Sequence, residues 1–464
     1  MEAAGLAAGG VVAWRRRLEA RVLAPLVGTG RAYYVMVVIL LALVAWGGYA
    51  YAIQFRQGMY ATGLHDRIFW GVYFTLFIYF LAASAGVTLV SSLLRLTNAR
   101  WRAPVTRASE ILTIALLIVA LMAITVNMSA PHRMLNVLLF GRWESQLVWD
   151  VYALVTTLVG RMIYLSLGTV RDYALCRDRI GHLVAAPRRL MFLIMSMGWN
   201  GNPEQARNLL IGQRIMAIII VPVAVMTPTV AAWIFGMMLR EPWDSPMFGI
   251  YFLGGAIYSG IAMLIIFMIV LRRAYRLEEF ITPTHFMHMG HMLVAFAVAM
   301  LFFNVSDFIT RGYKMSGDAA LFLHEMVQGE FAFIYWTYFW VGLVLPIVIM
   351  IVPFTRRPAG VVVAAVAAAA GILFERYFTV VGGLQVPLNP YDPPSYAPTW
   401  VEWSVGIALF ALLALLVTVT LKFVPVISLA EMEHAEPGVH TEPVEELLRE
   451  PPAEPALAPG GAGT

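Results

Sequence analysis

The chain has 464 residues, of which 60% are hydrophobic and only 13% charged, and its formal net charge is +4 at pH 7. A water-soluble protein could not hide so much apolar surface, so the composition excludes a soluble domain and favours a membrane protein. The positive charge does not indicate nucleic acid, because in a membrane protein the positions of the charges matter more than their sum. The single cysteine, Cys176, excludes a disulfide framework and a cluster held by thiolates of this chain.

The two ends of the chain differ in composition from the rest. Residues 1–32 are basic but lack the apolar core of a cleavable signal peptide, so we interpret them as a cytoplasmic amphipathic helix on the inner leaflet. Residues 426–464 are acidic, rich in Pro, Ala and Gly, and without apolar periodicity. This composition predicts a disordered cytoplasmic tail.

Between these ends lie ten apolar stretches, each long enough to cross the roughly 30 Å hydrocarbon layer. They are residues 33–53, 68–94, 109–130, 146–170, 215–239, 246–271, 288–309, 331–353, 359–384 and 400–424. The sequence therefore predicts an all-α polytopic membrane protein with its membrane domain at residues 33–425.

A short internal repeat predicts how the spans are grouped. The second span opens with Gly71-Val72-Tyr73-Phe74 and the sixth with Gly249-Ile250-Tyr251-Phe252, and both continue through small residues to arginines. We therefore expect two four-helix bundles, formed by the second to fifth and the sixth to ninth spans, with the first and tenth spans flanking them. The alternative is that the similarity between the two spans arose by chance, because small residues at helix interfaces are common in membrane proteins.

The loops alternate in their content of Lys and Arg. The N-terminal segment and every second loop carry 21 of these residues, whereas the other loops carry seven. By the positive-inside rule, this asymmetry predicts that both termini are cytoplasmic.

No histidine lies in the middle of any span, so the chain lacks the facing axial ligands that a membrane haem requires. His285, His288 and His291 cluster at the inner start of the seventh span, without a neighbouring acid or cysteine. We interpret them as solvated histidines at the membrane surface and expect no metal site. The absence of a Walker A sequence argues against an ATP-driven pump.

Polar and ionisable groups in apolar spans are costly in lipid and are therefore functional candidates. Most of them lie near the predicted outer side, while Arg161 is deeper. The outer group comprises Asn127, His132, Asp150, Asp307, His324, Glu330, Glu375, Arg376 and Tyr377. We interpret this group as a pocket where a lipid-soluble redox carrier exchanges electrons and protons, with Asp150, His132 and Glu375 as proton donors or acceptors.

Some of these groups also have a structural interpretation. Glu325, Glu330 and Glu402 fit wet carboxylates at the interface, and Glu375 with Arg376 fits a buried pair that ties helices together. Adjacent residues of a helix point about 100° apart, so we expect Glu375 and Arg376 to find partners on different neighbouring helices.

Several segments, in order along residues 30–425, carry a family resemblance. They are Ala83-Ser84-Ala85-Gly86, Trp149-Asp150-Val151, Gly255-Ala256-Ile257-Tyr258-Ser259-Gly260, Arg276-Leu277-Glu278-Glu279-Phe280-Ile281-Thr282 with His285, Glu375-Arg376-Tyr377 and Pro398-Thr399-Trp400-Val401-Glu402-Trp403. Together they resemble the NrfD or polysulfide-reductase-type membrane subunits, especially the ten-helix members found in alternative complex III.

The resemblance implies a subunit of a redox complex in a bacterial or archaeal cytoplasmic membrane, with no haem or iron–sulfur cluster of its own. Quinone or menaquinone would bind near the outer face as an exchangeable substrate. A ferredoxin-like iron–sulfur partner would dock there and exchange electrons with a molybdopterin-type subunit or a multihaem cytochrome c. Asp150 matches the acid of the family's Trp-Asp-Val motif.

With quinone as the carrier, two sets of residues receive roles. The expected binding residues are Asn127, Asp150, His324, Glu330, Arg376 and Tyr377. Arg161 and Asp307 are expected on a proton path.

Two departures from the family pattern affect these roles. Asn127 stands where close relatives have a His followed by Gly-Arg-Pro, which puts the proton acceptor of the quinone site in doubt. The fifth span has no ionisable residue between Arg214 and Arg240, although alternative-complex-III relatives carry a buried acid there. The second difference weakens a proton path through the first bundle, so quinone binding without pumping stands as an alternative to quinone binding coupled to proton translocation.

A secondary transporter or ion channel is the alternative from another class, because buried charges and repeated bundles also mark substrate pathways. Pro222 and Pro228 in the fifth span favour it, whereas the clustering of acids at the outer side argues against it.

Overall fold

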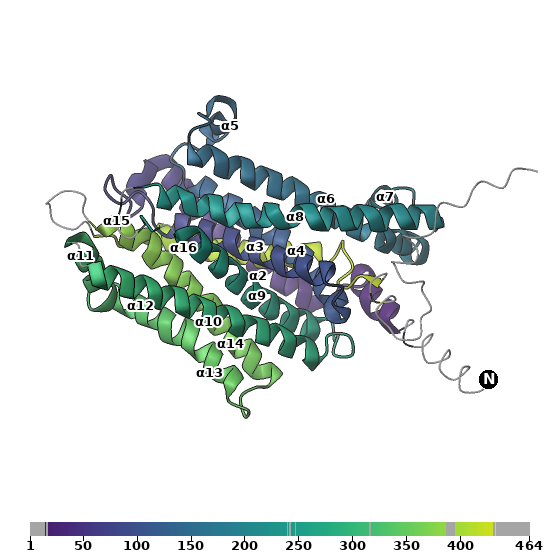
Figure 1. Ribbon diagram of the computed structural model, residues 1–464. Helices are drawn as coiled ribbons and strands as arrows, with labels where there is room; N and C mark the ends of the chain where they lie inside the picture. The colour runs from purple at the N-terminus through teal and green to yellow at the C-terminus, as the bar shows by residue number, and fades with distance from the viewer. Residues whose placement is uncertain are drawn as a thin grey trace, which may run out of the picture.

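The structure, a computed structural model, describes residues 14, 17–238, 240, 243–245, 247–314, 317–386, 395–429 and 432. Ten helices in these ranges are long and apolar enough to cross a membrane (Figure 1). They are α2 (Arg31–Gln57), α3 (Val72–Leu96), α4 (Ala103–Asn127), α6 (Gln146–Ile180), α8 (Pro203–Gly236), α9 (Phe248–Ala274), α10 (Pro283–Lys314), a composite of α12 (Ala332–Thr337), η4 (Tyr338–Val344) and α13 (Leu345–Ile351), a composite of α14 (Pro358–Tyr377), η5 (Phe378–Gly382) and α15 (Gly383–Gln385), and α16 (Trp400–Thr420). The predicted all-α polytopic fold is confirmed.

Shorter helices lie in the connections. They are η1 (Gly58–Ala61), η2 (Arg100–Arg102), η3 (Pro131–Arg133), α5 (Asn136–Phe140), α7 (Ala186–Met195) and α11 (Gly317–Val327).

The ten spans form the two predicted bundles. The first consists of α3, α4, α6 and α8, and the second consists of α9, α10 and the two composite spans. The flanking helices α2 and α16 pack against each other, and α16 also contacts α4 and α3 of the first bundle. The predicted arrangement is confirmed, with both flanking helices on the side of the first bundle.

The small residues of the internal repeat lie where α3 and α9 cross. A Cβ atom at Gly86 would overlap the Ala256 carbonyl oxygen, and a Cβ atom at Gly260 would overlap the Val87 nitrogen. Backbones approach this closely only where the residue has no side chain. The crossing therefore joins the two bundles through direct backbone contact.

The stretches η4 and η5 are π-helical. A π-helical turn disturbs the i→i−4 ladder, so its carbonyls need other donors. The Gly342 carbonyl in η4 accepts a hydrogen bond from the Tyr258 hydroxyl at 2.6 Å. The Thr379 carbonyl in η5 accepts one from the Trp243 indole nitrogen at 2.8 Å. Side chains from other elements thus stabilise both stretches.

The N-terminal helix differs from its predicted role at the membrane surface. Residues 17–27 are helical, and the apolar side chains of Leu18, Val22 and Leu26 are buried against the rest of the protein. The apolar face of this helix, which we expected to lie in lipid, therefore packs against the protein. Residues 1–13 of the predicted segment lie outside the described residues.

The C-terminal segment after α16 packs against the same end of the molecule. Lys422 donates to the carbonyls of Pro25 and Gly28 at 2.8 and 2.9 Å, and Ile427 and Leu429 are buried. The packed body therefore extends beyond residue 425. Most of the predicted acidic tail, residues 433–464, lies outside the described residues.

We predict that Gly86→Ala destabilises the protein by about 1–3 kcal/mol, because the added methyl group meets backbone atoms of α9 that cannot rotate away. Gly48→Ala in α2 is the matched control, since a Cβ atom there meets nothing within 4 Å. It should stabilise the helix by about 0.5–1 kcal/mol. Unfolding of both variants in detergent micelles by SDS titration measures the difference, and equal stability would contradict the close crossing.

Candidate functional site

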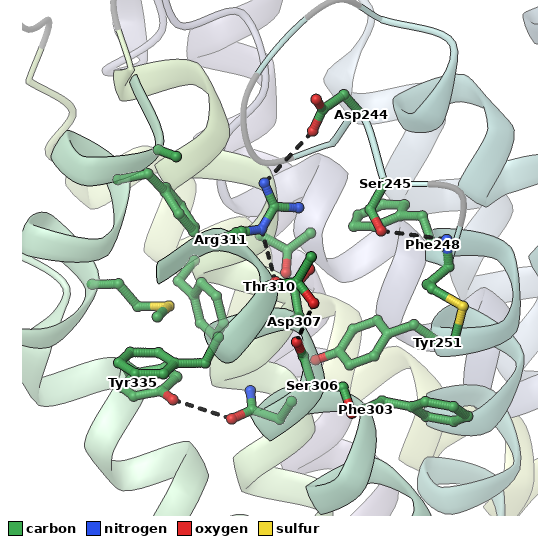
Figure 2. A pocket seen from close by; sticks show the side chains of 18 residues that line it. Asp244, Ser245, Phe248, Tyr251, Phe303, Ser306, Asp307, Thr310, Arg311 and Tyr335 are labelled. Carbon is green, nitrogen blue, oxygen red and sulfur yellow. Dashed lines mark hydrogen bonds and ion pairs between the residues drawn. The ribbon is translucent and has the colours of Figure 1, made fainter. Parts of the chain in front are cut away.

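A cavity of about 300 Å³ lies at one end of the second bundle (Figure 2). It is formed by the start of α9, the end of α10, and parts of α11, α12 and η5, which places it near one membrane surface. Its lining combines apolar and aromatic side chains with polar and charged ones. The lining residues include Phe248, Tyr251, Phe303, Asn304, Asp307, Arg311, Phe322, Met326, Tyr335, Phe378 and Thr379.

Charged side chains surround the edge of this cavity. The Arg311 guanidinium is buried and lies 2.9 Å from the Asp307 carboxylate, one turn earlier on α10. It also lies 3.5 Å from the carboxylate of Asp244, which precedes α9. Both carboxylates are about half exposed, at 47% and 53%. The arginine therefore links α10 to the loop before α9 where the cavity meets solvent or headgroups.

One hydroxyl group of the lining connects the cavity to a buried carboxylate. Thr379 donates to Glu375 Oε1 at 3.0 Å. A second lining hydroxyl, that of Tyr251, lies 3.3 Å from the Tyr338 hydroxyl. Glu375 itself does not line the cavity. A proton could therefore pass between a molecule in the cavity and Glu375 through a side-chain hydroxyl.

Glu375 and Arg376 are fully buried and form an ion pair at 3.3 Å. They pair with each other, which differs from the prediction that they would find partners on different neighbouring helices, although Arg376 also contacts α9. The guanidinium lies 3.9 Å from the centre of the Phe252 ring. It also occupies the space beside Gly255, where a Cβ atom would come within 2.5 Å of Nη2.

The ion pair leaves part of the arginine unsatisfied. Nε and Nη2 of Arg376 have no hydrogen-bond partner among the described residues. A buried guanidinium normally satisfies its donors, so these two are candidates for contact with a water molecule or a bound ligand.

Asn304 supplies a second polar contact on another side of the cavity. The Tyr335 hydroxyl donates to Asn304 Oδ1 at 3.1 Å, which leaves the amide NH₂ available as a donor. Sequence reasoning missed Asn304, Tyr335 and Thr379, because their chemistry depends on three different helices meeting. Tyr251 could have been identified from the sequence, because it lies in the repeated motif that opens α9.

The other predicted site residues do not meet at this cavity. Asp150 is buried on α6 in the first bundle, and its Oδ1 has no hydrogen-bond partner among the described residues. Asn127 Oδ1, at the end of α4, is also buried without such a partner. His132 and His324 are exposed. Of the predicted residues, only Asp307 lines the cavity, and Glu375 lies directly behind its wall.

Two further predicted groups lie close to the second bundle. Glu330 is exposed and accepts a hydrogen bond from Gln385 at 3.4 Å, in agreement with a wet carboxylate. Tyr377, next to the buried ion pair, is partly buried. Neither residue lines the 300 Å³ cavity.

Glu402 was expected to be a wet interfacial carboxylate, and this prediction is wrong. It is fully buried and accepts hydrogen bonds from the Gly63 and Thr399 backbone amides at 2.8 and 3.0 Å and from the Tyr396 hydroxyl. Burial and the nearby Glu402 carboxylate raise the pKa of Tyr396 well above its usual range. Glu402 therefore fixes the start of α16 to the loop before α3.

The first bundle contains its own series of buried polar groups. Arg161 donates to the Ser84 carbonyl at 2.9 Å, and the Thr157 and Thr227 hydroxyls lie 2.7 Å apart. Next to Arg161 is a small cavity of about 20 Å³, lined by hydroxyl groups and Glu110. A polar cavity of this size can hold one water molecule.

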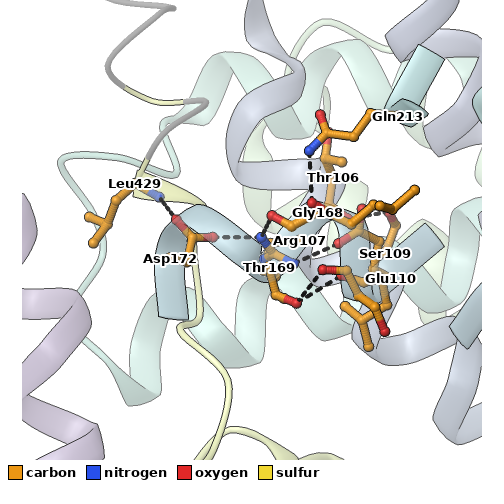
Figure 3. Close-up of polar contacts among 12 residues, drawn as sticks. Thr106, Arg107, Ser109, Glu110, Gly168, Thr169, Asp172, Gln213 and Leu429 are labelled. Carbon is orange, nitrogen blue, oxygen red and sulfur yellow. Dashed lines mark hydrogen bonds and ion pairs between the residues drawn. The ribbon is translucent and has the colours of Figure 1, made fainter. Parts of the chain in front are cut away.

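Toward the other end of the bundle, the series continues into a buried ion cluster (Figure 3). Arg107 lies 2.9 Å from the Glu110 carboxylate and 2.6 Å from the Asp172 carboxylate, all three side chains being almost inaccessible. Asp172 also accepts from the Leu429 backbone amide at 3.1 Å. The cluster therefore ties α4, α6 and the C-terminal segment together.

The fold and the cavity together define a polytopic membrane protein with a small-molecule site at one end of a helical bundle. The chain belongs to the polysulphide reductase NrfD family, whose model matches residues 61–388. The matched range contains both bundles and excludes the flanking helices α2 and α16. The resemblance recognised in the sequence is confirmed.

Several named proteins are similar to this chain over most of its length, and their names describe subunits of reductases or of an oxidoreductase. The chain is 26% identical over 412 residues to a predicted membrane subunit of dimethyl sulfoxide reductase from Halobacterium salinarum, covering 84% of this chain and 90% of that protein. It is 22% identical to a subunit of selenate reductase from Mesobacillus selenatarsenatis, over 84% and 93% of the two chains. It is 23% identical to the Hdr-like menaquinol oxidoreductase integral membrane subunit of Archaeoglobus fulgidus, over 85% and 94%.

We predict that Arg107→Met destabilises the protein by about 3–5 kcal/mol, because it leaves two buried carboxylates without their cation. Asp178→Asn is the control, since Asp178 is 61% exposed and its ion pair with Arg177 should contribute about 0–1 kcal/mol. Thermal unfolding in detergent measures both. An Arg107→Met variant as stable as the control would show that the cluster does not hold this end together.

Proposed function

We propose that this protein is the quinone-handling membrane subunit of a multi-subunit oxidoreductase. One observation carries the proposal: Thr379, whose hydroxyl lines the second-bundle cavity, donates to the buried carboxylate of Glu375 at 3.0 Å. A quinone needs an apolar enclosure, donors for its carbonyls and a route for protons. The cavity offers residues for all three.

The cavity suits the chemistry of a quinone head group. Its volume of about 300 Å³ lies at the lower end of the range of ligand pockets, and aromatic side chains form part of its walls. Tyr251 is placed to donate a hydrogen bond to one carbonyl, and the Asn304 amide is placed to donate to another. Glu375 would take up the proton that leaves a quinol hydroxyl, or return it to a quinone, while Arg376 stabilises the charged carboxylate.

The electrons would come from, or go to, partner subunits. The names of the relatives as membrane subunits of reductases and of a menaquinol oxidoreductase support an assembly of several chains. We propose a ferredoxin-like iron–sulfur partner that docks over the cavity end, with a molybdopterin-type subunit or a multihaem cytochrome c beyond it. Menaquinone is the favoured carrier.

We also propose the orientation in the membrane. The excess of Lys and Arg in alternate loops puts both termini in the cytoplasm and the cavity at the outer face of a bacterial or archaeal cytoplasmic membrane. Arg95 ends α3, and Arg272 and Arg273 end α9, at the end of the bundles opposite the cavity.

Proton movement through the first bundle is a separate part of the proposal. Asp150 lies near the cavity end of the membrane, and Arg161 with its neighbouring hydroxyls lies deeper on the same helix. The buried polar groups continue to the Arg107 cluster, which gives α6 a polar stripe along much of its length. Asp307, at the edge of the second-bundle cavity, would exchange protons with the outer surface.

The alternative of a secondary transporter loses the support of the two prolines in the fifth span. Such proteins use broken helices near the membrane midplane. Pro222 and Pro228 lie inside α8, which remains one helix from Pro203 to Gly236.

We predict that Tyr251→Phe lowers quinol-linked turnover of the assembled complex by about 10²-fold, because it removes a hydroxyl of the cavity lining that is placed to donate to a quinone carbonyl. The matched control is Tyr73→Phe at the equivalent position of the repeat in α3, where the hydroxyl donates to Gln54 at 2.8 Å. Turnover in proteoliposomes and the affinity for a quinone analogue are the measurements. Full turnover of Tyr251→Phe would exclude this cavity as the quinone site.

We predict that Asp150→Asn lowers turnover by about 10²-fold but leaves the affinity for the quinone analogue unchanged, because Asp150 does not line the cavity. Asp66→Asn, an exposed acid in the loop before α3, is the control. Loss of analogue binding in Asp150→Asn would instead place the quinone in the first bundle. Wild-type turnover would remove Asp150 from the mechanism.

A further inference from the structure

The connection between α6 and α8 contains a short helix with an uncovered apolar face. Helix α7 packs on α6, with Phe192 fully buried against Tyr173 at a ring distance of 6.0 Å. On its other face and just beyond its end, four large apolar side chains are each more than half exposed, three in α7 and one at Met197. They are Leu190 at 56%, Leu193 at 56%, Ile194 at 62% and Met197 at 60%.

The length of α7 determines where this face can lie. Ten residues make a helix of roughly 15 Å, about half of the hydrocarbon thickness, so α7 cannot cross a membrane. It lies at the end of the long helix α6, opposite the 300 Å³ cavity (Figure 1). A short helix with an exposed apolar face at this level lies in the membrane plane, at the boundary between acyl chains and headgroups.

Basic side chains adjoin this face. Arg179 and Arg189 are exposed, and neither forms an ion pair with an acid in the part of the chain that the structure describes. Arg188 is different, because it donates to the Leu26 carbonyl at 2.8 Å and lies over the Phe423 ring at 5.3 Å. Arg188 therefore holds α7 to the body of the protein, and its two neighbours remain available for an external anion.

An open groove lies beside Arg179, between the N-terminal helix and the end of α6. Its walls are mostly apolar, and Leu183, 58% exposed, joins it to the segment that leads into α7. The lining consists of Glu19, Ala20, Leu23, Ala24, Val27, Gly28, Arg179, Ile180 and Leu183. An apolar groove with a cation at its edge has the shape and the charge to hold an acyl chain below a phosphate.

We infer that this surface binds an acidic phospholipid. The phosphate is held by Arg179 and Arg189, one acyl chain lies in the groove, and the apolar face of α7 rests in the surrounding lipid. The occupant is lipid rather than a protein partner, because the apolar face adjoins membrane-spanning helices and the exposed side chains of Arg179 and Arg189 beside it are positively charged, with Glu19 the one acid of the groove lining. This binding site is independent of the quinone cavity.

The charge requirement is tested with the full chain in nanodiscs of phosphatidylcholine that contain one-fifth phosphatidylglycerol. Mass spectrometry of the lipids retained after purification should show enrichment of phosphatidylglycerol. The double variant Arg179→Gln with Arg189→Gln should reduce this enrichment by about fivefold for each charge removed. The control variant, Arg133→Gln with Arg142→Gln, removes two exposed arginines at the opposite end of α6 and should keep it. Equal enrichment in both double variants would overturn the inference.

The position of α7 is tested independently by fluorescence. The native Cys176 is fully buried, so Ile194→Cys introduces one reactive thiol for an environment-sensitive dye. In liposomes of the same lipids, the dye should emit at shorter wavelength and be quenched by brominated acyl chains. Asn200→Cys, at an exposed polar position after α7, is the control and should stay unquenched. Emission from position 194 that equals the control would show that α7 faces water, and the inference would fail.

Discussion

The close crossing of α3 and α9 is the constraint on which the two-bundle architecture depends. At Gly86 and Gly260 the backbones touch, so the two central helices cannot shift without separating the bundles. In lipid there is no hydrophobic force to bring helices together, and close packing between small residues becomes a main source of association. This contact therefore sets the relative positions of the polar groups that each bundle encloses.

Each bundle contains a buried ion pair or cluster, and the two differ in how fully their groups are bonded. In the first bundle one arginine, Arg107, serves two carboxylates and a carbonyl, so the cluster is densely bonded. In the second, Arg376 has one carboxylate partner and an aromatic ring, and two of its nitrogens are unsatisfied among the described residues. Densely bonded buried charges stabilise a fold, whereas incompletely bonded ones mark a place where chemistry can occur. This contrast favours the second bundle as the reaction site.

Much of the fold could be predicted from the sequence, because apolar length and small-residue repeats are local signals. The site was harder to predict. Spacing along one helix shows which residues share a face, but not which helix lies opposite, so Asp150 and Glu375 were grouped although they belong to different bundles. Glu402 was misjudged for the same reason, since one of its donors, the Gly63 amide, comes from a loop that is distant in the sequence. Asn304 is uncharged, so the sequence did not mark it as a candidate site residue. The structure identifies it because Tyr335 lies beside it.

The π-helical stretch η5 has a mechanical consequence. Its Thr379 carbonyl is held by Trp243 from the loop before α9, while the Thr379 side chain holds Glu375. Asp244, the next residue of that loop, is bound to Arg311 on α10. A single surface loop is thus fastened to both sides of the cavity. A protein that docks on this loop and displaces it would pull on the buried carboxylate and on the cavity rim at once, so that assembly and proton affinity would become linked.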